Sequence, residues 1–203
     1  MGFRCGIVGL PNVGKSTLFN ALTQTAQAQA ANYPFCTIEP NIGEVTVPDE
    51  RLDNLAEIAN SVNKIPTRMT FVDIAGLVEG ASKGEGLGNK FLANIREMDA
   101  VAYVLRCFDN DDISHVNGKI DPVSDSQTVE TELMMADMES LERRLPTLEK
   151  KSRGGDKESQ EMLPVVKDLL ALLEEGQPAR ALKIAPDQTR TLRGLQLLTS
   201  KPV

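Results

Sequence analysis

The chain has 203 residues, of which 41% are hydrophobic and 25% are charged, and its formal net charge is −7. This length and composition fit one globular core with an insertion, and they exclude collagen-like, disordered and disulfide-stapled proteins. The acidic balance disfavours bulk nucleic-acid binding, so DNA is not an expected partner, and the three scattered cysteines predict reduced thiols rather than a zinc site.

The first 108 residues alternate between strand-like and helix-like segments. Short apolar runs bounded by Gly or Pro predict strands over residues 3–8, 43–48, 69–74 and 99–108. Helical patterns cover residues 16–24 and 51–59. Because several of these strands are almost continuously apolar, we expect an α/β fold with a mostly parallel central sheet and helices on both faces.

The remainder of the chain, from about residue 126, has a helical pattern. Apolar residues recur at steps of four and three, which is the period of a coiled-coil seam. These are Met134, Met138, Leu141, Leu145 and Leu148, and then Met162, Val166, Leu169 and Leu173. We predict an antiparallel coiled-coil hairpin, whose helices Pro146 and Pro164 interrupt or kink, followed by a third helix over residues 187–198.

The strongest motif lies between the first strand and the first helix. Residues 9–16 read Gly-x-x-x-x-Gly-Lys-Ser, a P-loop whose backbone N–H groups surround the phosphates of a nucleotide. Lys15 is expected to place its charge on the β and γ oxygens, and the Ser16 hydroxyl to bind Mg²⁺. The residues predicted to contact the nucleotide here are Asn12, Val13, Gly14, Lys15, Ser16 and Thr17.

A second motif, Asp-x-x-Gly, follows the strand predicted over residues 69–74. It predicts that Asp73 approaches Mg²⁺ through water and that the Gly76 N–H meets the γ-phosphate. Thr37 is the candidate for a further Mg²⁺ ligand, although a plain loop hydroxyl fits its spacing too. Five glycines then predict a switch loop that orders around the γ-phosphate, and a flexible linker is the alternative. These are Gly76, Gly80, Gly84, Gly86 and Gly88.

Three runs, residues 6–22, 32–41 and 72–78, closely resemble the YchF-type Obg-like ATPases, and residues 80–89 and 106–108 extend the resemblance. The resemblance implies a translation-factor-class P-loop NTPase that prefers ATP, accepts GTP, and associates with the ribosome or a ribosomal subunit in the cytoplasm. Members of the group are also expected to carry a base-recognition strand and a C-terminal ubiquitin-like domain, both beyond Val203.

The domain organisation expected from these patterns has three parts. Residues 1–125 form the first part of the NTPase domain, residues 126–199 form the helical insertion, and residues 200–203 begin the returning strand. The nucleotide-binding domain would then be incomplete at its C-terminus. Without an apolar run near the ~18 residues of a membrane helix, and with no leader-like start, the sequence predicts a monomeric cytoplasmic protein with no membrane partner.

Hydrolysis is expected to be slow, because Leu77 stands where Ras-like switches carry a water-orienting Gln. Asn12 resembles a ligand for K⁺ in potassium-dependent relatives, and a turn-stabilising side chain is the other interpretation. His115, the only histidine, is a candidate water positioner, and a surface loop residue is the other interpretation. The function predicted is a Mg²⁺-dependent NTPase switch, and the alternatives are a GTPase of the wider Obg group or a nucleotide-binding module with negligible hydrolysis.

A cysteine next to Thr37 and a group of cations at the hairpin turn each allow two interpretations. Cys36 adjoins Thr37, where oxidation would disturb the metal-binding loop, but a small apolar filler explains it too. Four cations at the hairpin turn could meet rRNA phosphates, although solvated helix ends carry such residues as well. These are Lys150, Lys151, Arg153 and Lys157.

Overall fold

The structure is a computed structural model that describes residues 2–24, 40–76, 87–110, 112–116, 118–185 and 188–203. Its elements, in chain order, are β1 (Phe3–Val8), α1 (Lys15–Thr23), β2 (Asn41–Thr46), α2 (Glu50–Ile58), β3 (Arg68–Asp73), α3 (Leu87–Arg96), β4 (Ala100–Tyr103), α4 (Pro122–Arg153), α5 (Lys157–Glu174), the 3-10 turn η1 (Ala179–Ala181) and α6 (Thr189–Leu195). No helix within these ranges is both long and apolar enough to span a bilayer.

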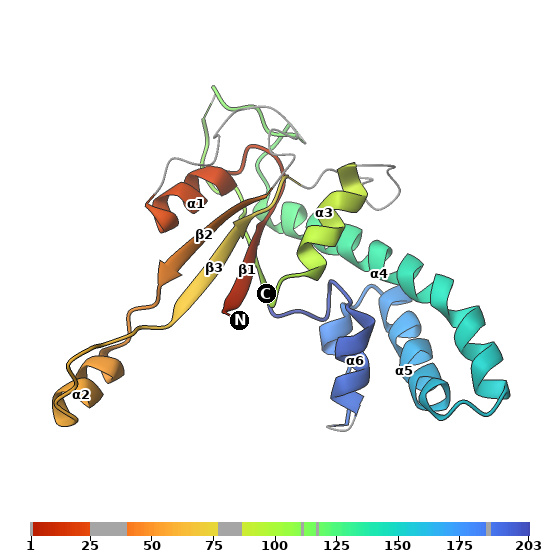
Figure 1. The fold of residues 1–203 in the computed structure, drawn as a ribbon. Coiled ribbons are helices and arrows are strands. Elements are labelled where there is room, and N and C mark those ends of the chain that lie inside the picture. Colours follow the sequence, from red (N-terminus) through yellow and green to blue (C-terminus); the bar gives the residue numbers. More distant parts are fainter. Residues whose placement is uncertain (1, 25–39, 77–86, 111, 117, 186–187) are drawn as a thin grey trace.

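A four-stranded sheet in the order β2-β3-β1-β4 forms the centre of the fold (Figure 1). Strand β1 runs parallel to both β3 and β4, whereas β2 is antiparallel to β3, so the predicted mostly parallel sheet is confirmed. Ile7 pairs with Asp73, and Val8 pairs with Tyr103. The carboxyl ends of β1, β3 and β4 therefore meet at one edge of the sheet, where α/β proteins bind their ligands.

Helices cover both faces of this sheet, as the sequence predicts. On one face Phe19 of α1 packs on Ile7, and both side chains are fully buried. On the other face a larger apolar cluster joins strand residues such as Val72 to Ile95 of α3 and Leu133 of α4. Helix α3 was not predicted, because its glycine-rich approach resembles a loop.

Strand β4 is shorter than expected, and the prediction of a strand as far as residue 108 is wrong. Val104 N–H still donates to the Val8 carbonyl at 2.7 Å, but the chain then turns around the guanidinium of Arg106. That group donates to the carbonyls of Phe108 at 3.1 Å, Asn110 at 3.1 Å and Ile113 at 2.8 Å. The buried Arg106 side chain thus holds these residues together as a loop, in the place where the strand was expected to continue.

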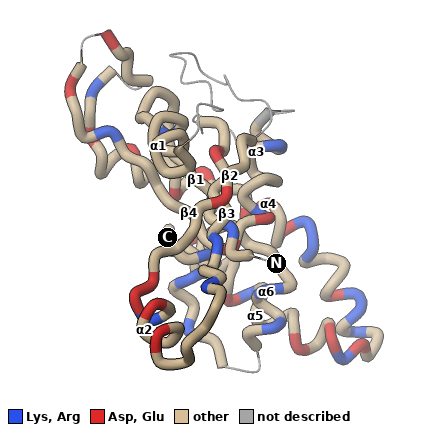
Figure 2. Tube along the Cα trace, turned by 60° about the vertical axis from the view of Figure 1, so that its left-hand side comes forward, with Lys and Arg blue, Asp and Glu red and all other residues tan. Residues whose placement is uncertain are grey.

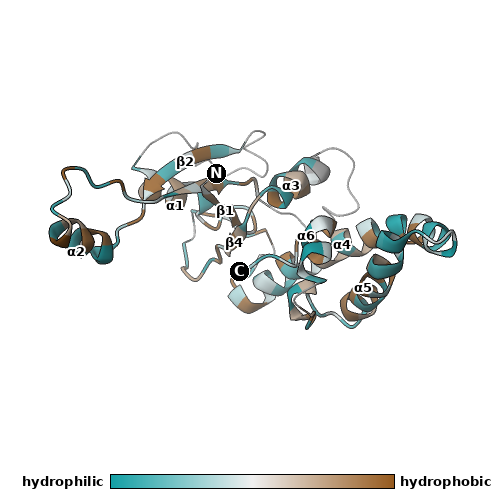
Figure 3. Ribbon diagram, turned by 60° about the horizontal axis from the view of Figure 1, so that its bottom comes forward, coloured by the Kyte–Doolittle hydropathy of each residue, from teal (hydrophilic) through white to brown (hydrophobic). Residues whose placement is uncertain are grey.

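Helices α4 and α5, of 32 and 18 residues, pack side by side as the predicted hairpin (Figure 1). All nine predicted seam residues fall in one apolar cluster, which Leu195 and Leu197 also join. Figure 3 shows the alternation of hydrophobic and hydrophilic residues along both helices. The expected interruption at Pro146 and Pro164 is wrong, since both lie exposed inside continuous helices, where water can bond the carbonyls that lose a donor. Helix α6 is shorter than the predicted range, whose residue 187 lies outside the described residues.

Helix α4 contributes to two apolar clusters. Val129 and Leu133 pack in the cluster under the sheet, whereas Leu141 packs in the hairpin cluster. Between them the buried Asp137 carboxylate accepts the N–H groups of Leu198 and Thr199, each at 2.8 Å, and the Thr199 hydroxyl at 2.7 Å. The expected boundary between residues 125 and 126 falls inside this helix, and the division into an NTPase unit and an insertion stays a prediction.

The last residues lie beside β4. Val101 N–H donates to the Pro202 carbonyl at 3.0 Å. The Lys201 ammonium donates to the Arg96 carbonyl at 3.0 Å and also to the Met98 carbonyl, so it fastens the end of α3. Burial lowers the pKa of Lys201.

Candidate functional site

The loop between β1 and α1 has a backbone that only particular residues can adopt. A Cβ atom on Gly9 would lie 2.3 Å from the Val104 carbonyl oxygen, so a side chain does not fit there. Asn12 and Gly14 have positive φ angles of 62° and 99°, in the left-handed region that favours glycine and asparagine. Helix α1 starts directly behind this turn, and no side chain of the described residues caps its N-terminus. The first-turn N–H groups of α1 thus remain available to an anion.

Lys15 lies inside this loop with only 8% of its surface exposed. Its ammonium donates to the Leu10 carbonyl at 2.7 Å. Burial lowers the pKa of Lys15 to about 8, and the nearby Asp73 carboxylate partly opposes that shift. A cation held in this position with few competing partners is suited to pair with phosphate oxygens.

Ser16 and Asp73 meet although they are far apart in the sequence. The Ser16 hydroxyl donates to Asp73 Oδ2 at 2.7 Å, and Asp73 is 1% exposed. Burial raises the pKa of Asp73, while the hydrogen bonds from Ser16 and Asn41 and the charge of Lys15 act in the opposite direction. A hydroxyl and a carboxylate are the hard oxygen ligands that Mg²⁺ prefers, so this pair fits an ion shared with phosphates.

The described segments contain no group of three or more His, Cys, Asp or Glu side chains that would hold a metal by themselves. A nucleotide-bound Mg²⁺ does not need such a group, because phosphates and water supply most of its ligands. Thr37, the predicted further ligand, lies outside the described residues, as do Leu77, Cys36 and the glycines at positions 80, 84 and 86.

Gly76 packs against the phosphate loop. A Cβ atom there would lie 3.0 Å from the N, Cα and Cγ atoms of Pro11. A side chain at residue 76 would therefore press on the loop, and the glycine leaves the segment after β3 room to approach it. Val13 is 4% exposed and packs in the core below, whereas Thr17 is exposed. All the predicted nucleotide contacts among the described residues thus lie at one edge of the sheet.

The loop after β4 is attached at two points near this edge. The Asn12 amide donates to the Ser114 carbonyl at 3.1 Å. The neighbouring His115 pairs through Nε2 with Asp125 Oδ2 at 2.9 Å, and the two side chains are 4% and 2% exposed. The His115 side chain is therefore buried and joined to the first turn of α4, one residue from a contact with the phosphate loop.

The sequence did not single out Arg106 or Asp125 as residues of this region. Arg106 is 1% exposed, stacks 4.8 Å from the centre of the Phe108 ring, and holds together the loop that carries His115. A basic residue at the end of an almost continuously apolar run was the available signal. Asp125 gave none, because an acidic residue in the first turn of a helix is common for dipole reasons.

The cations predicted at the hairpin turn lie on the surface at the far end of α4 and α5. Lys150, Lys151, Arg153 and Lys157 are all exposed, and Arg153 lies 4.0 Å from Glu149. Figure 2 shows acidic and basic residues interspersed at this end of the hairpin. A phosphate-binding role for them stays a prediction.

Comparison with known proteins gives consistent matches. The model of one family, described as 50S ribosome-binding GTPase, matches residues 4–143. Curated relatives called ribosome-binding ATPase YchF are 59% identical in Haemophilus ducreyi and 56% identical in Escherichia coli O157:H7, over 100% of this chain and 55% of each relative. The solved Schizosaccharomyces pombe YchF GTPase is 41% identical with a TM-score of 0.76, over 100% of this chain and 55% of that one. The chain spans about half the length of the curated relatives it matches.

Proposed function

This chain belongs to the 50S ribosome-binding GTPase family and matches its YchF members along its whole length, and from that premise we propose that it binds a nucleoside triphosphate with Mg²⁺ and hydrolyses it slowly. The observation that carries the proposal is the contact between the Ser16 hydroxyl and Asp73 Oδ2, which joins the two nucleotide motifs at 2.7 Å. Ser16 would bind Mg²⁺ directly and Asp73 would hold it through water, and the bound ion would neutralise phosphate charge.

The chain's own groups would grip the phosphates in a simple way. The Lys15 ammonium would leave the Leu10 carbonyl and donate to phosphate oxygens, while the N-terminus of α1 contributes its N–H groups. Gly76, packed on Pro11, would offer its N–H close to the terminal phosphate. Asn12, Val13 and Thr17 complete the proposed contacts.

For the hydrolysis step we propose His115 as the residue that positions the attacking water. Its support is location, since Ser114 is bonded to the phosphate loop and Asp125 orients the imidazole through Nε2. His115→Ala should lower single-turnover phosphate release at least about tenfold while leaving nucleotide affinity within about twofold. Release at the wild-type rate would remove His115 from the reaction.

The preferred base is proposed to be adenine, with guanine accepted, because the curated relatives carry the name ATPase. GTP is the second candidate, favoured by the family description and by the name of the S. pombe relative. K⁺ is a proposed further cofactor beside Asn12, whose amide nitrogen is engaged by Ser114 while its oxygen is the atom a cation would use. Faster phosphate release in K⁺ than in Na⁺ would support this role.

The proposed partner is the ribosome or one of its subunits, in the cytoplasm, with the protein acting as a monomeric switch. The relatives' names support this proposal. The exposed cations at the hairpin turn are the candidate contact with rRNA. Ribosome binding that weakens steeply with salt, and that is lost when Lys150 and Lys151 are changed to Glu, is the expected result.

Calorimetric titration with non-hydrolysable ATP and GTP analogues, followed by phosphate release with and without ribosomes, tests the proposal. We expect tighter binding of the ATP analogue, slow release, and acceleration by ribosomes. Tight binding without any release would favour a nucleotide-binding module, and preference for the GTP analogue would favour the GTPase.

A further inference from the structure

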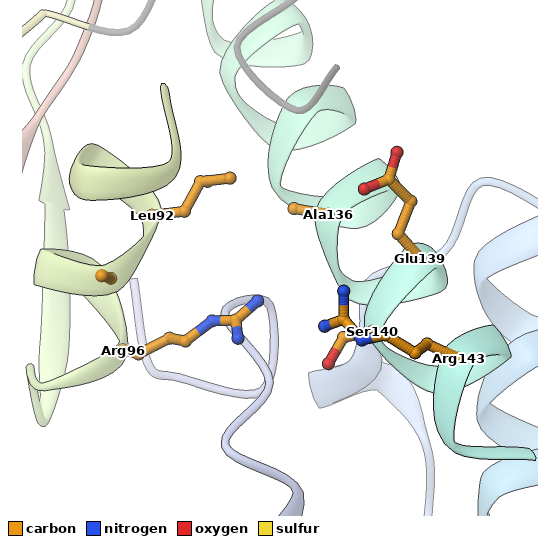
Figure 4. Close-up of a pocket in the computed structure, with 7 residues that line it drawn as sticks. Leu92, Arg96, Ala136, Glu139, Ser140 and Arg143 are labelled. Carbon is orange, nitrogen blue, oxygen red and sulfur yellow. The ribbon is translucent and has the colours of Figure 1, made fainter. Parts of the chain in front are cut away.

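A pocket of about 140 Å³ lies between α3 and α4, away from the phosphate loop. Arg96 enters it from the last turn of α3, and Arg143 enters it from α4. The two guanidinium groups point toward one another across the space between the helices (Figure 4). Two like charges that face each other in this way repel, and an anion between them offsets that repulsion.

Among the described residues, neither guanidinium group has a bonded partner. In the part of the chain that the structure describes, neither one makes a hydrogen bond or ion pair, and the Arg96 Nε atom is buried without an acceptor. Buried donors of this kind are rare in folded proteins and usually have an acceptor that belongs to the ligand or solvent. Arg96 thus has donor capacity directed into the pocket.

Two carboxylates lie near enough to compete, but neither one occupies the space. Asp137 feels the charge of Arg96, yet its oxygens accept bonds from Leu198 and Thr199. Glu139 lines the pocket four residues before Arg143, where an ion pair along the helix is expected. Its carboxylate instead turns away from the Arg143 guanidinium (Figure 4).

We propose that this pocket binds an oxyanion of the phosphate class, held between the guanidinium groups of Arg96 and Arg143 with the Ser140 hydroxyl as a further donor. Guanidinium forks match the oxygens of phosphate, and each contact is a charge-assisted hydrogen bond. The pocket has room for such a group, since a water molecule in the liquid fills about 30 Å³. Leu92 and Ala136 supply apolar walls that strengthen these contacts by excluding water.

The ligand would connect two elements that serve different parts of the molecule. Helix α3 packs under the sheet, and α4 extends from Asp125 beside His115 to the hairpin turn. An anion held by one arginine from each helix would fasten them to each other. The site needs neither nucleotide nor hydrolysis, so its test is independent of the proposed function.

The direct test is an NMR titration of the whole ¹⁵N-labelled protein with inorganic phosphate at constant ionic strength, with ADP and Mg²⁺ present to fill the phosphate loop. The arginine Nε–H signals are the readout, because the buried Arg96 Nε–H exchanges slowly with water. We expect a saturable shift of the Arg96 and Arg143 signals. A shift that rises linearly with phosphate and never saturates would overturn the site.

Three variants distinguish a specific change in phosphate affinity from unfolding, because one of them is expected to bind phosphate more tightly. Arg143→Gln, at an exposed position, should weaken phosphate binding about tenfold, because one charge-assisted partner is lost. Glu139→Gln should tighten binding severalfold, because it removes the competing negative charge. Arg193→Gln, at an exposed position of α6, makes the same charge change as Arg143→Gln and should leave the affinity unchanged. Equal weakening by Arg143→Gln and Arg193→Gln would show a bulk charge effect and overturn the proposal.

A parallel titration with a short single-stranded RNA distinguishes the sources of the phosphate. Saturation by inorganic phosphate at lower concentration than by RNA phosphodiesters supports a free oxyanion as the ligand. The reverse order, with the same response to Arg143→Gln, supports an RNA backbone phosphate. Binding of neither ligand overturns the site.

Discussion

In the loop from Gly9 to Ser16 several positions are fixed by one atom that they approach, whereas in the hairpin of α4 and α5 the buried positions follow from the period of the apolar residues. Gly9 meets the Val104 carbonyl, Lys15 meets the Leu10 carbonyl, and Ser16 meets Asp73. Leu141 and Leu169 are instead buried among many apolar neighbours. Changes in the loop should therefore alter binding with little effect on stability, and changes in the hairpin seam should do the reverse.

The largest expected effect is on the stability of the hairpin. Leu141→Ala removes a fully buried side chain and leaves a cavity, so we expect the free energy of unfolding to fall by about 3 kcal/mol. Denaturant unfolding measures this change. Val123→Ala, on the same helix but 67% exposed, should change it by less than about 0.5 kcal/mol. If Leu141→Ala weakened ATP binding as strongly as it weakens the fold, the separation between the two regions would fail.

The next effect is on binding by the loop. Lys15→Ala removes the buried ammonium, so ATP affinity should fall about 100-fold, which corresponds to about 2.7 kcal/mol. Calorimetric titration measures it, and Lys150→Ala at the hairpin turn is the matched control with unchanged affinity. An equal loss in both variants would contradict a specific role for Lys15.

Asp137 sharpens the comparison, because it belongs to α4 but is fixed by individual atoms as the loop residues are. Asp137→Asn should destabilise the protein by about 1–2 kcal/mol, since the amide nitrogen cannot accept a hydrogen bond and at least one of the three donors loses its acceptor. Burial raises the pKa of Asp137, so the folded state holds this proton more tightly than the unfolded state does. The stability advantage of the wild type should therefore shrink as pH rises from about 4 through the raised pKa. Thermal unfolding of both proteins measures this trend, and an advantage that grows with pH would contradict it.

The sequence predicted the elements of both regions for different physical reasons. Strand β1 was predicted with the observed bounds, because an apolar run ends at a glycine loop, and the hairpin seam was predicted because its period is regular. The proximity of Ser16 and Asp73 agrees with the prediction that both motifs serve one Mg²⁺ ion, but their direct hydrogen bond was not predicted. The predicted interruption at Pro146 and Pro164 does not occur, because both prolines are exposed and water can bond the carbonyls that lose an N–H donor.

Contacts made by single side chains over irregular backbone could not be predicted. Arg106 holds together the loop after β4 through carbonyls whose positions depend on the folded loop, and nothing in the spacing of His115 and Asp125 indicates that they pair. Arg96 and Arg143 are brought together only by the packing of α3 on α4. Such residues show no periodicity, so tertiary structure is needed to find them.

The central claim is that the phosphate loop and the Asp-x-x-Gly motif act on one Mg²⁺ ion. Its most direct test is calorimetric titration of ATP, with Mg²⁺ and with EDTA, on the wild type and on Ser16→Ala. If Ser16 and Asp73 hold the ion together, the wild type should bind ATP at least about tenfold more tightly with Mg²⁺, and Ser16→Ala should lose most of that difference. Ser16→Ala with the full Mg²⁺ dependence of the wild type would contradict the proposed site.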